Sequence, residues 1–220
     1  MAFSGTASAD MRMSLVGTYL LASAHFAARA KAIELMEATT VTEELQTEHR
    51  GSVLASVMQS SAALEAEVYE IAAHGPGHHL GSNGIDAAGH QLLEPLTDLI
   101  DSQEVLERYC LVLHLLQKPA LDRSTHVWEH AQLLIRLRNS VVHYKSRWNN
   151  EIEATKFLKS LKKLRQAKPP FVSIHSPYYP TQCLNAACAL WAVQSALRFL
   201  EVFYGNLGFP GRFSYLNLTR

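Results

Sequence analysis

The sequence predicts an all-α protein, folded as an antiparallel bundle of five to seven helices. Three observations support this fold class. Apolar residues recur at steps of three and four along every long segment, no alternating pattern exceeds four residues, and 48% of the chain is hydrophobic. The chain contains no Walker A or GxGxxG phosphate loop, which argues against the nucleotide-binding α/β folds. A length of 220 residues fits one domain with a sizeable core.

Residues 1–38 are expected to contribute an N-terminal helix, over 11–37, that packs on the bundle or serves as a dimerisation arm. The apolar stretch 14–30 ends in Ala-Arg-Ala, which resembles a signal-peptide cleavage site. Because Asp10 precedes this stretch and Thr18 interrupts it, we interpret it as an amphipathic helix of a cytoplasmic protein. It is too short and too polar to span a bilayer, so no membrane partner is expected.

The main bundle is assigned to residues 39–205. Thr39 and Thr40, followed by Glu43, predict the start of a long helix that ends near Ala73. A loop with four glycines and one proline follows at 74–85. The remaining predicted helices are 86–100 with a break at Pro95, 104–117 at the centre of the bundle, 124–148 capped by Ser124 or Thr125, 151–166, and 181–204 capped by Thr181, before an irregular tail at 206–220.

The charges are unevenly distributed although the net charge is zero. Residues 1–135 carry seven basic and 17 acidic side chains, whereas residues 136–168 carry ten basic and two acidic ones. Half of all Lys and Arg residues therefore lie in a segment of net charge +8. Such a segment favours a polyanionic partner such as RNA, and the alternative is a solvated, lysine-rich helix face.

One face of the predicted helix 124–148 concentrates polar side chains. On a helical wheel, the residues within about 60° of His143 are Arg136, Asn139, Ser140 and Arg147. The opposite side forms a core stripe of Leu134, Leu137, Val141, Tyr144 and Trp148. Arg138 falls about 140° from His143, closer to the core stripe, so ideal helix geometry does not pair these two side chains.

These residue types suit cleavage of RNA without a metal. The imidazole of His143 can transfer a proton near neutral pH, and a guanidinium such as Arg138 stabilises charge on a phosphate. Asn139, one turn before His143, can orient the ring. Spacing alone carries little information, because about 1.8 Arg-x4–6-His pairs are expected by chance. Four occur, and Arg108–His114 and Arg123–His130 lack the Asn and the aliphatic context.

The stretch Arg138-Asn139-x-x-x-His143 resembles the motif helix of the HEPN superfamily, in which Arg, often followed by a polar residue, precedes His by four to six residues. Ser61-x-x-x-Glu65 resembles a stretch that many HEPN proteins carry on an earlier helix packed against the motif helix. Glu65 could assist the site, and the alternative is a solvent-facing carboxylate on an amphipathic helix.

The resemblance implies a small helical protein, often a metal-independent ribonuclease of toxin–antitoxin or phage-defence systems. It implies a homodimer whose two motif helices face each other, so that two Arg138 and two His143 line one basic cleft. Lys145, Lys159, Lys162 and Lys163, with Arg136 and Arg147, would bind RNA. An antitoxin or nucleotidyltransferase would be the neutralising partner. HEPN toxins controlled by nucleotidyltransferases carry His-x-Tyr, whereas Tyr144 directly follows His143, which favours a core role for Tyr144.

Other residues suggest weaker sites. His74, His78, His79 and His90 match no standard metal-site spacing, so no metal or other cofactor is expected. Trp128, Trp148 and Trp191 could stack on bases, but each lies at an apolar helical phase, which favours core packing. Cys110 is expected to be a small buried apolar residue.

Three hypotheses therefore remain. The first is a metal-independent endoribonuclease of HEPN type that uses Arg138 and His143. The second is a catalytically silent HEPN-like bundle that binds a partner protein or a nucleotide. The third is an unrelated helical scaffold in which the motif is accidental.

Overall fold

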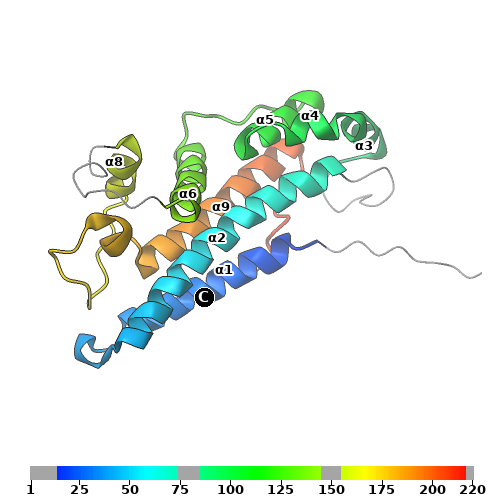
Figure 1. Cartoon of the computed structure of the whole chain (residues 1–220). Helices are drawn as coiled ribbons and strands as arrows, with labels where there is room; N and C mark the ends of the chain where they lie inside the picture. The colour runs from blue at the N-terminus through cyan, green and yellow to red at the C-terminus, as the bar shows by residue number, and fades with distance from the viewer. Residues whose placement is uncertain (1–13, 74–84, 145–154, 217–220) are drawn as a thin grey trace, which may run out of the picture.

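The computed structural model describes residues 14–73, 85–144 and 155–216. Within these residues the protein is a packed bundle of eight α-helices without strands (Figure 1). The all-α class is confirmed. The described part has one helix more than the predicted maximum of seven, because Pro95 divides the segment 86–100 into two separate helices.

Three long helices form the body of the bundle: α1 (Val16–Glu34), α2 (Glu43–Ala73) and α9 (Ala186–Leu207). They lie side by side and pack against one another in all three combinations (Figure 1). α1 and α2 are antiparallel, whereas α2 and α9 run in the same direction, which departs from a purely antiparallel bundle. Thirteen buried residues, from Ala186 to Leu207, make α9 the central core helix.

One carboxylate joins these three helices at their shared end. Oε1 of Glu34, the last residue of α1, lies 2.8 Å from Nε2 of the buried His49 on α2. The same oxygen accepts a hydrogen bond of 2.8 Å from the backbone N–H of Ala186, the first residue of α9. A carboxylate at this position also interacts favourably with the helix dipole of α9.

The observed caps shift two helix starts. Thr42, and not Thr40, accepts a hydrogen bond of 3.3 Å from the backbone N–H of Leu45, so α2 begins at Glu43. Asn185, and not Thr181, caps α9 and accepts a hydrogen bond of 2.7 Å from the N–H of Cys188. The side chain of Asn or Thr caps a helix only when its own backbone is extended, and Asn185 has this conformation.

α3 (Ala87–Leu93), α4 (Thr97–Asp101) and α5 (Val105–Leu115) cover one end of the long helices (Figure 1). The side chain of Asp86 caps α3 at the N–H of Gly89. Tyr109 on α5 donates a hydrogen bond of 2.6 Å to the carbonyl oxygen of Leu64 on α2. The prediction that this helix is central is wrong, because α5 lies over one end of the long helices (Figure 1). Cys110 packs against the core but is only half-buried, not buried as predicted.

α6 (His126–Val142) packs on α9 and α2, and α8 (Lys156–Lys163) packs beside α6. The hydroxyl of Thr125 caps α6 at the N–H of Trp128, as predicted. α6 ends at Val142, earlier than the predicted end at Trp148, and residues 145–154 lie outside the described part.

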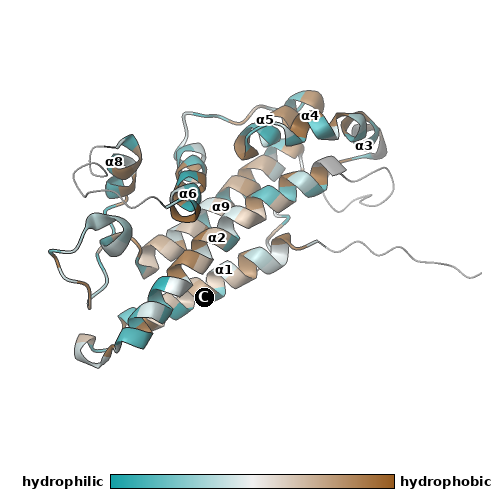
Figure 2. Cartoon of the chain, in the orientation of Figure 1, coloured by the Kyte–Doolittle hydropathy of each residue, from teal (hydrophilic) through white to brown (hydrophobic). Residues whose placement is uncertain are grey.

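Hydropathy colours follow this arrangement. α9 is pale to brown along most of its length, whereas hydrophilic colours dominate the start of α2 (Figure 2). α9 is long and apolar enough to cross a membrane, and 61% of its most apolar window is buried inside the bundle, as in a core helix. After α9 the chain has no helix over 208–216, and Phe213 and Leu216 of this segment are buried in the core.

Candidate functional site

The polar face of α6 points away from the core. Arg136, Asn139 and His143 are exposed and follow one another at steps of three and four residues. Leu134 and Leu137 are fully buried on the opposite side. The predicted core stripe is therefore confirmed at Leu134 and Leu137, whereas Val141 is only partly buried and Trp148 lies outside the described residues.

Arg138 lies between these two faces and points toward α2. Its guanidinium forms an ion pair with the carboxylate of Glu65, and its Nε donates a hydrogen bond of 3.4 Å to Oγ of Ser61. A third guanidinium nitrogen, Nη1, donates a hydrogen bond of 2.9 Å to Oδ1 of Asn139. Ser61, Glu65, Arg138 and Asn139 thus form one connected polar cluster, hereafter the Arg138 cluster.

The Arg138 cluster joins the two stretches that the sequence singled out separately. Ser61 is buried and Glu65 is partly exposed, one turn later on the same face of α2. The alternative in which Glu65 merely faces solvent is wrong, because its carboxylate is paired with Arg138. Since Asn139 holds the guanidinium, its structural partner is Arg138, and no bond from Asn139 to the His143 ring is found among the described residues.

His143 stands apart from the Arg138 cluster. It is the first residue beyond α6, with φ −103° and ψ 36°, and its backbone N–H donates to the carbonyl oxygen of Asn139. Its side chain is exposed, and no hydrogen bond joins it to Arg138 in the part of the chain that the structure describes. One chain therefore provides the guanidinium and the imidazole on neighbouring but different faces, in agreement with the wheel geometry.

An aromatic patch, which sequence reasoning missed, lies beside His143. The hydroxyl of the buried Tyr179 donates a hydrogen bond of 3.0 Å to Oγ of Ser140 on α6. The ring of Tyr179 lies 6.2 Å from that of Tyr144 and 5.9 Å from that of Phe157 on α8. The predicted core role of Tyr144 is wrong, because its side chain is 48% exposed. The aromatic residues flanking the prolines of 168–180 were the available signal.

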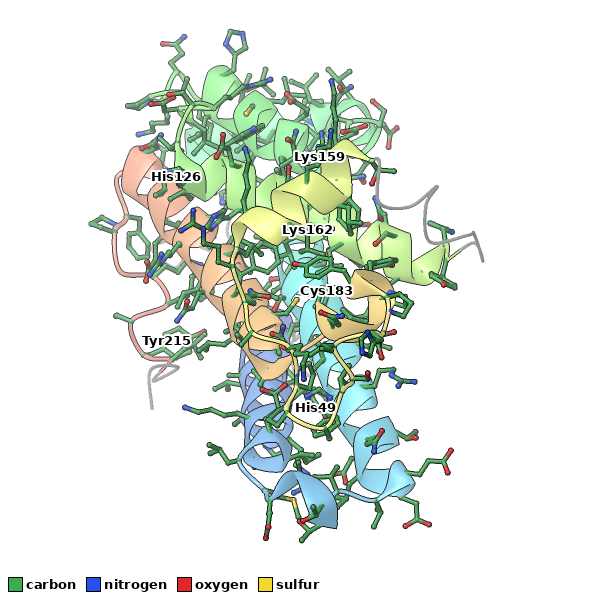
Figure 3. All side chains as sticks on the ribbon, turned by 90° about the vertical axis from the view of Figure 1, so that its left-hand side faces the viewer. His49, His126, Lys159, Lys162, Cys183 and Tyr215 are labelled. Carbon is green, nitrogen blue, oxygen red and sulfur yellow. The ribbon has the colours of Figure 1, made fainter. Side chains whose placement is uncertain are left out.

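The basic residues fall into two groups. Lys159, Lys162 and Lys163 are exposed on α8, whose Leu158 and Leu161 are buried, so this short helix presents its lysines to solvent. Figure 3 shows Lys159 and Lys162 on one side of the molecule, above the segment that carries Cys183. Arg136 is exposed on α6, whereas Lys145 and Arg147 lie outside the described residues.

The two competing Arg–His pairs have local structural roles. Arg108 donates hydrogen bonds to the backbone oxygens of Gln103 and Asp101, and His114 is exposed at the end of α5. Arg123 pairs with Glu107 and lies 5.0 Å above the ring of Trp128. Partial burial, together with the neighbouring His126, lowers the pKa of His130. These pairs provide matched controls for the motif on α6.

The described residues contain no group of three or more His, Cys, Asp or Glu side chains that could hold a metal ion. His90 is a buried residue of α3, and the other three histidines considered with it, His74, His78 and His79, lie outside the described part. Trp128 and Trp191 are buried, which confirms core packing for both, whereas Trp148 is not described.

No protein-family model, curated protein or solved structure gives a significant match to this chain. The chemistry of the site therefore has to be inferred from its geometry. A guanidinium held by a carboxylate, an exposed imidazole one turn away and a lysine-rich helix beside them can bind a phosphodiester and transfer a proton.

Proposed function

We propose that the protein is a metal-independent endoribonuclease of HEPN type, acting as a toxin or a defence effector. The observation that carries this proposal is the Arg138 cluster, because it brings Ser61-x-x-x-Glu65 of α2 against Arg138-Asn139 of α6. Two short patterns that resemble the same superfamily would not be expected to meet in space if both were accidental. The position of Lys159, Lys162 and Lys163 on the adjacent α8 supports a polyanionic substrate.

In the proposed reaction, His143 accepts the proton of an RNA 2′-hydroxyl. The 2′-oxygen then attacks the adjacent phosphorus while the bond from phosphorus to the 5′-oxygen breaks. The products are a 2′,3′-cyclic phosphate and a 5′-hydroxyl, which takes up the proton that the imidazole received. Arg138 stabilises the charge on the phosphate oxygens, and Glu65 and Asn139 hold its guanidinium in place.

A homodimer accounts for the separation of the two side chains. The guanidinium of Arg138 and the exposed His143 lie on different faces of α6 in one chain. If two α6 helices face each other, the imidazole of one chain approaches the guanidinium of its partner. The protein is proposed to act in the cytoplasm, restrained by an antitoxin or a nucleotidyltransferase.

A silent bundle is the second candidate, and one observation favours it. Arg138 is already engaged by Glu65, Ser61 and Asn139, so a phosphate must share its guanidinium or displace the carboxylate. A bundle that only binds a partner protein or a nucleotide needs no free guanidinium.

Alanine variants separate the two candidates. His143→Ala and Arg138→Ala should each reduce RNA cleavage by about 10² to 10⁴-fold, while circular dichroism still reports a folded helical protein. Cleavage should persist in EDTA and leave a cyclic phosphate end. His114→Ala and His130→Ala are the matched controls and should cleave normally. If all four variants cleave alike, the assignment of Arg138 and His143 is wrong; if pure wild-type protein cleaves no RNA, the silent bundle is supported.

A further inference from the structure

The aromatic patch beside His143 is defined by Tyr144, Phe157, Tyr178 and Tyr179. Its rings come from three parts of the chain, namely the end of α6, the start of α8 and the segment before α9. Tyr179 lies at its centre, buried, with its ring against those of Tyr144 and Phe157 and its hydroxyl bound to Ser140. The patch is therefore fixed to Ser140 on α6 and to Tyr144, two residues beyond the end of that helix.

Tyr144 is the accessible member of this patch. Its side chain is 48% exposed although the buried ring of Tyr179 supports one side of it. A tyrosine packed in a core would be fully covered, and a tyrosine on a mobile surface would lack the contact with Tyr179. A ring that contacts a second ring on one side and is about half exposed leaves apolar surface open to solvent, on which a nucleobase can stack.

Positive charge borders the aromatic patch on the side of α8. Nζ of Lys162 lies 5.2 Å from the centroid of the Tyr178 ring, and burial raises the pKa of Tyr178 to about 12, so this ring stays neutral. Lys159 and Lys163 are exposed on the same short helix, and Figure 3 shows Lys159 and Lys162 on a common side. Aromatic rings next to cations favour a ligand with both unpaired bases and phosphates, which is single-stranded nucleic acid.

We propose that Tyr144 stacks on one unpaired base of single-stranded RNA next to the cleaved phosphate, while Lys159 and Lys162 bind the adjoining phosphates. This proposal rests on the proposed endoribonuclease function, since it places the base beside His143. Tyr144 thus selects unpaired over paired RNA, because a base inside a duplex already stacks on its neighbours.

The test uses single-stranded RNA of about 12 nucleotides with 2′-O-methyl groups and a central 2-aminopurine. This probe lacks the attacking 2′-hydroxyl, so binding is measured without cleavage, and stacking quenches its fluorescence. Tyr144→Ala should weaken binding roughly tenfold and abolish the quenching, whereas Tyr144→Phe should preserve both. Tyr69→Ala is the matched control, since Tyr69 on α2 is 52% exposed, and it should bind as the wild type does. In a duplex of the same sequence the base is already stacked, so addition of the protein should cause no further quenching.

Cleavage of unmodified RNA, measured in parallel, distinguishes the possible failures. If the wild type cleaves RNA and Tyr144→Ala binds the probe as Tyr69→Ala does, the stacking proposal is overturned and the endoribonuclease stands. If the wild type quenches the probe but cleaves nothing, Tyr144 stacks on RNA and the proposed catalytic function is wrong. If the wild type neither binds nor cleaves, both proposals are overturned; dissociation of a dimer by Tyr144→Ala would then identify the patch as a protein interface.

Discussion

Two ion pairs on α2 contrast sharply although their carboxylates are two residues apart. Glu65 pairs with Arg138 of α6, and the two side chains are 35% and 23% exposed. Glu67 pairs with Arg212 of the C-terminal segment, and these side chains are 1% and 19% exposed. Residues two apart on a helix point about 200° from each other, so the pairs lie on opposite sides of α2.

The environment of Glu67 indicates a structural role. Its Oε1 accepts hydrogen bonds from Tyr204 on α9 and, at 3.2 Å, from Nε of Arg212. The guanidinium of Arg212 also lies 5.1 Å from the ring of Tyr204 and 5.5 Å from that of Phe213. The two arginines are similarly exposed, at 19% for Arg212 and 23% for Arg138, so the difference between the pairs lies in the carboxylates, which are 1% exposed for Glu67 and 35% for Glu65. The comparison suggests that partial exposure, and not charge pairing itself, distinguishes a candidate site from a structural contact.

The largest expected difference between the two pairs is in stability. Arg212→Ala leaves the buried carboxylate of Glu67 without its cation and should lower the free energy of unfolding by about 3 kcal/mol. Arg138→Ala removes a partly exposed pair and should lower it by about 1 kcal/mol or less. Urea unfolding followed by circular dichroism measures both values. Equal losses would contradict the division into a structural pair and a candidate site.

The pH dependence of stability should follow the buried carboxylate. Burial raises the pKa of Glu67 above its ordinary value of 4.5, although Arg212 and Tyr204 oppose this effect and the charge of Glu70 reinforces it. The folded protein therefore binds a proton more tightly than the unfolded chain does. The associated stability is fully present below pH 4.5 and is lost as pH rises through the raised pKa, with a slope of at most about 1.4 kcal/mol per pH unit.

Glu67→Gln removes this titratable group. The difference between the wild-type and variant free energies of unfolding, plotted against pH, therefore gives the contribution of Glu67. Glu65→Gln is the matched control, because it removes a carboxylate on the opposite side of α2, and it should retain the pH-dependent loss of stability that Glu67→Gln removes. A wild-type curve that runs parallel to the Glu67→Gln curve between pH 4 and pH 8 would contradict the raised pKa, since folding would then not change the proton affinity of Glu67.

A smaller effect is expected for cleavage when Glu65 is changed. If Glu65 positions Arg138, Glu65→Ala should lower RNA cleavage by about tenfold, and Glu65→Gln should restore most of it, because the amide oxygen can still accept from the guanidinium. Unfolding free energies of the two variants should agree within about 0.5 kcal/mol. Faster cleavage by Glu65→Ala would mean that the carboxylate competes with RNA for Arg138.

Ser61→Ala should have the smallest effect. Its hydrogen bond to Nε of Arg138 is long, at 3.4 Å, and the guanidinium keeps its contacts to Glu65 and Asn139. We expect cleavage to fall less than threefold, measured beside Asn139→Ala, which removes the shorter bond of 2.9 Å and should cost more. The reverse order would assign the positioning of Arg138 to α2 alone.

The periodicity of apolar residues was sufficient to predict the helical class and the approximate helix positions, because a helix that packs on a core needs apolar residues at steps of three and four. It was insufficient for several boundaries. Thr39, Thr40 and Thr42 are equally good caps by residue type, but Thr39 and Thr40 lie in a separate 3₁₀ helix, Ala38–Thr40, so Thr42 caps α2. Similarly, Thr181 lies within the turn Tyr178–Gln182, which delays the start of α9 to Ala186.

Only the part of the candidate site that depends on helical phase within α6 was predictable from the residues themselves. The wheel placed Arg138 away from His143 and close to the core stripe, but it contains no information on which helix packs there. The contact with Glu65 was anticipated only through the resemblance, which implied that the helix of Ser61-x-x-x-Glu65 packs against the motif helix. Glu67 resembled any solvated glutamate, because the arginine that pairs with it lies 145 residues later. Tyr179 was missed for the same reason, since its partner Ser140 is 39 residues earlier.

The arrangement of α1, α2 and α9 has a consequence for biosynthesis. α1 and α2 are synthesised before the other helices. α9 packs against both of them, and Glu34 and His49 help to anchor it, but α9 is the last helix of the bundle to be synthesised. A nascent chain that ends before Ala186 therefore exposes the surface of α2 that α9 later covers, and it leaves Ser56 and Glu67 without their hydrogen-bond partners Ala189 and Tyr204. Contacts between distant parts of the chain form slowly, so we expect this partly folded intermediate to persist and to bind chaperones.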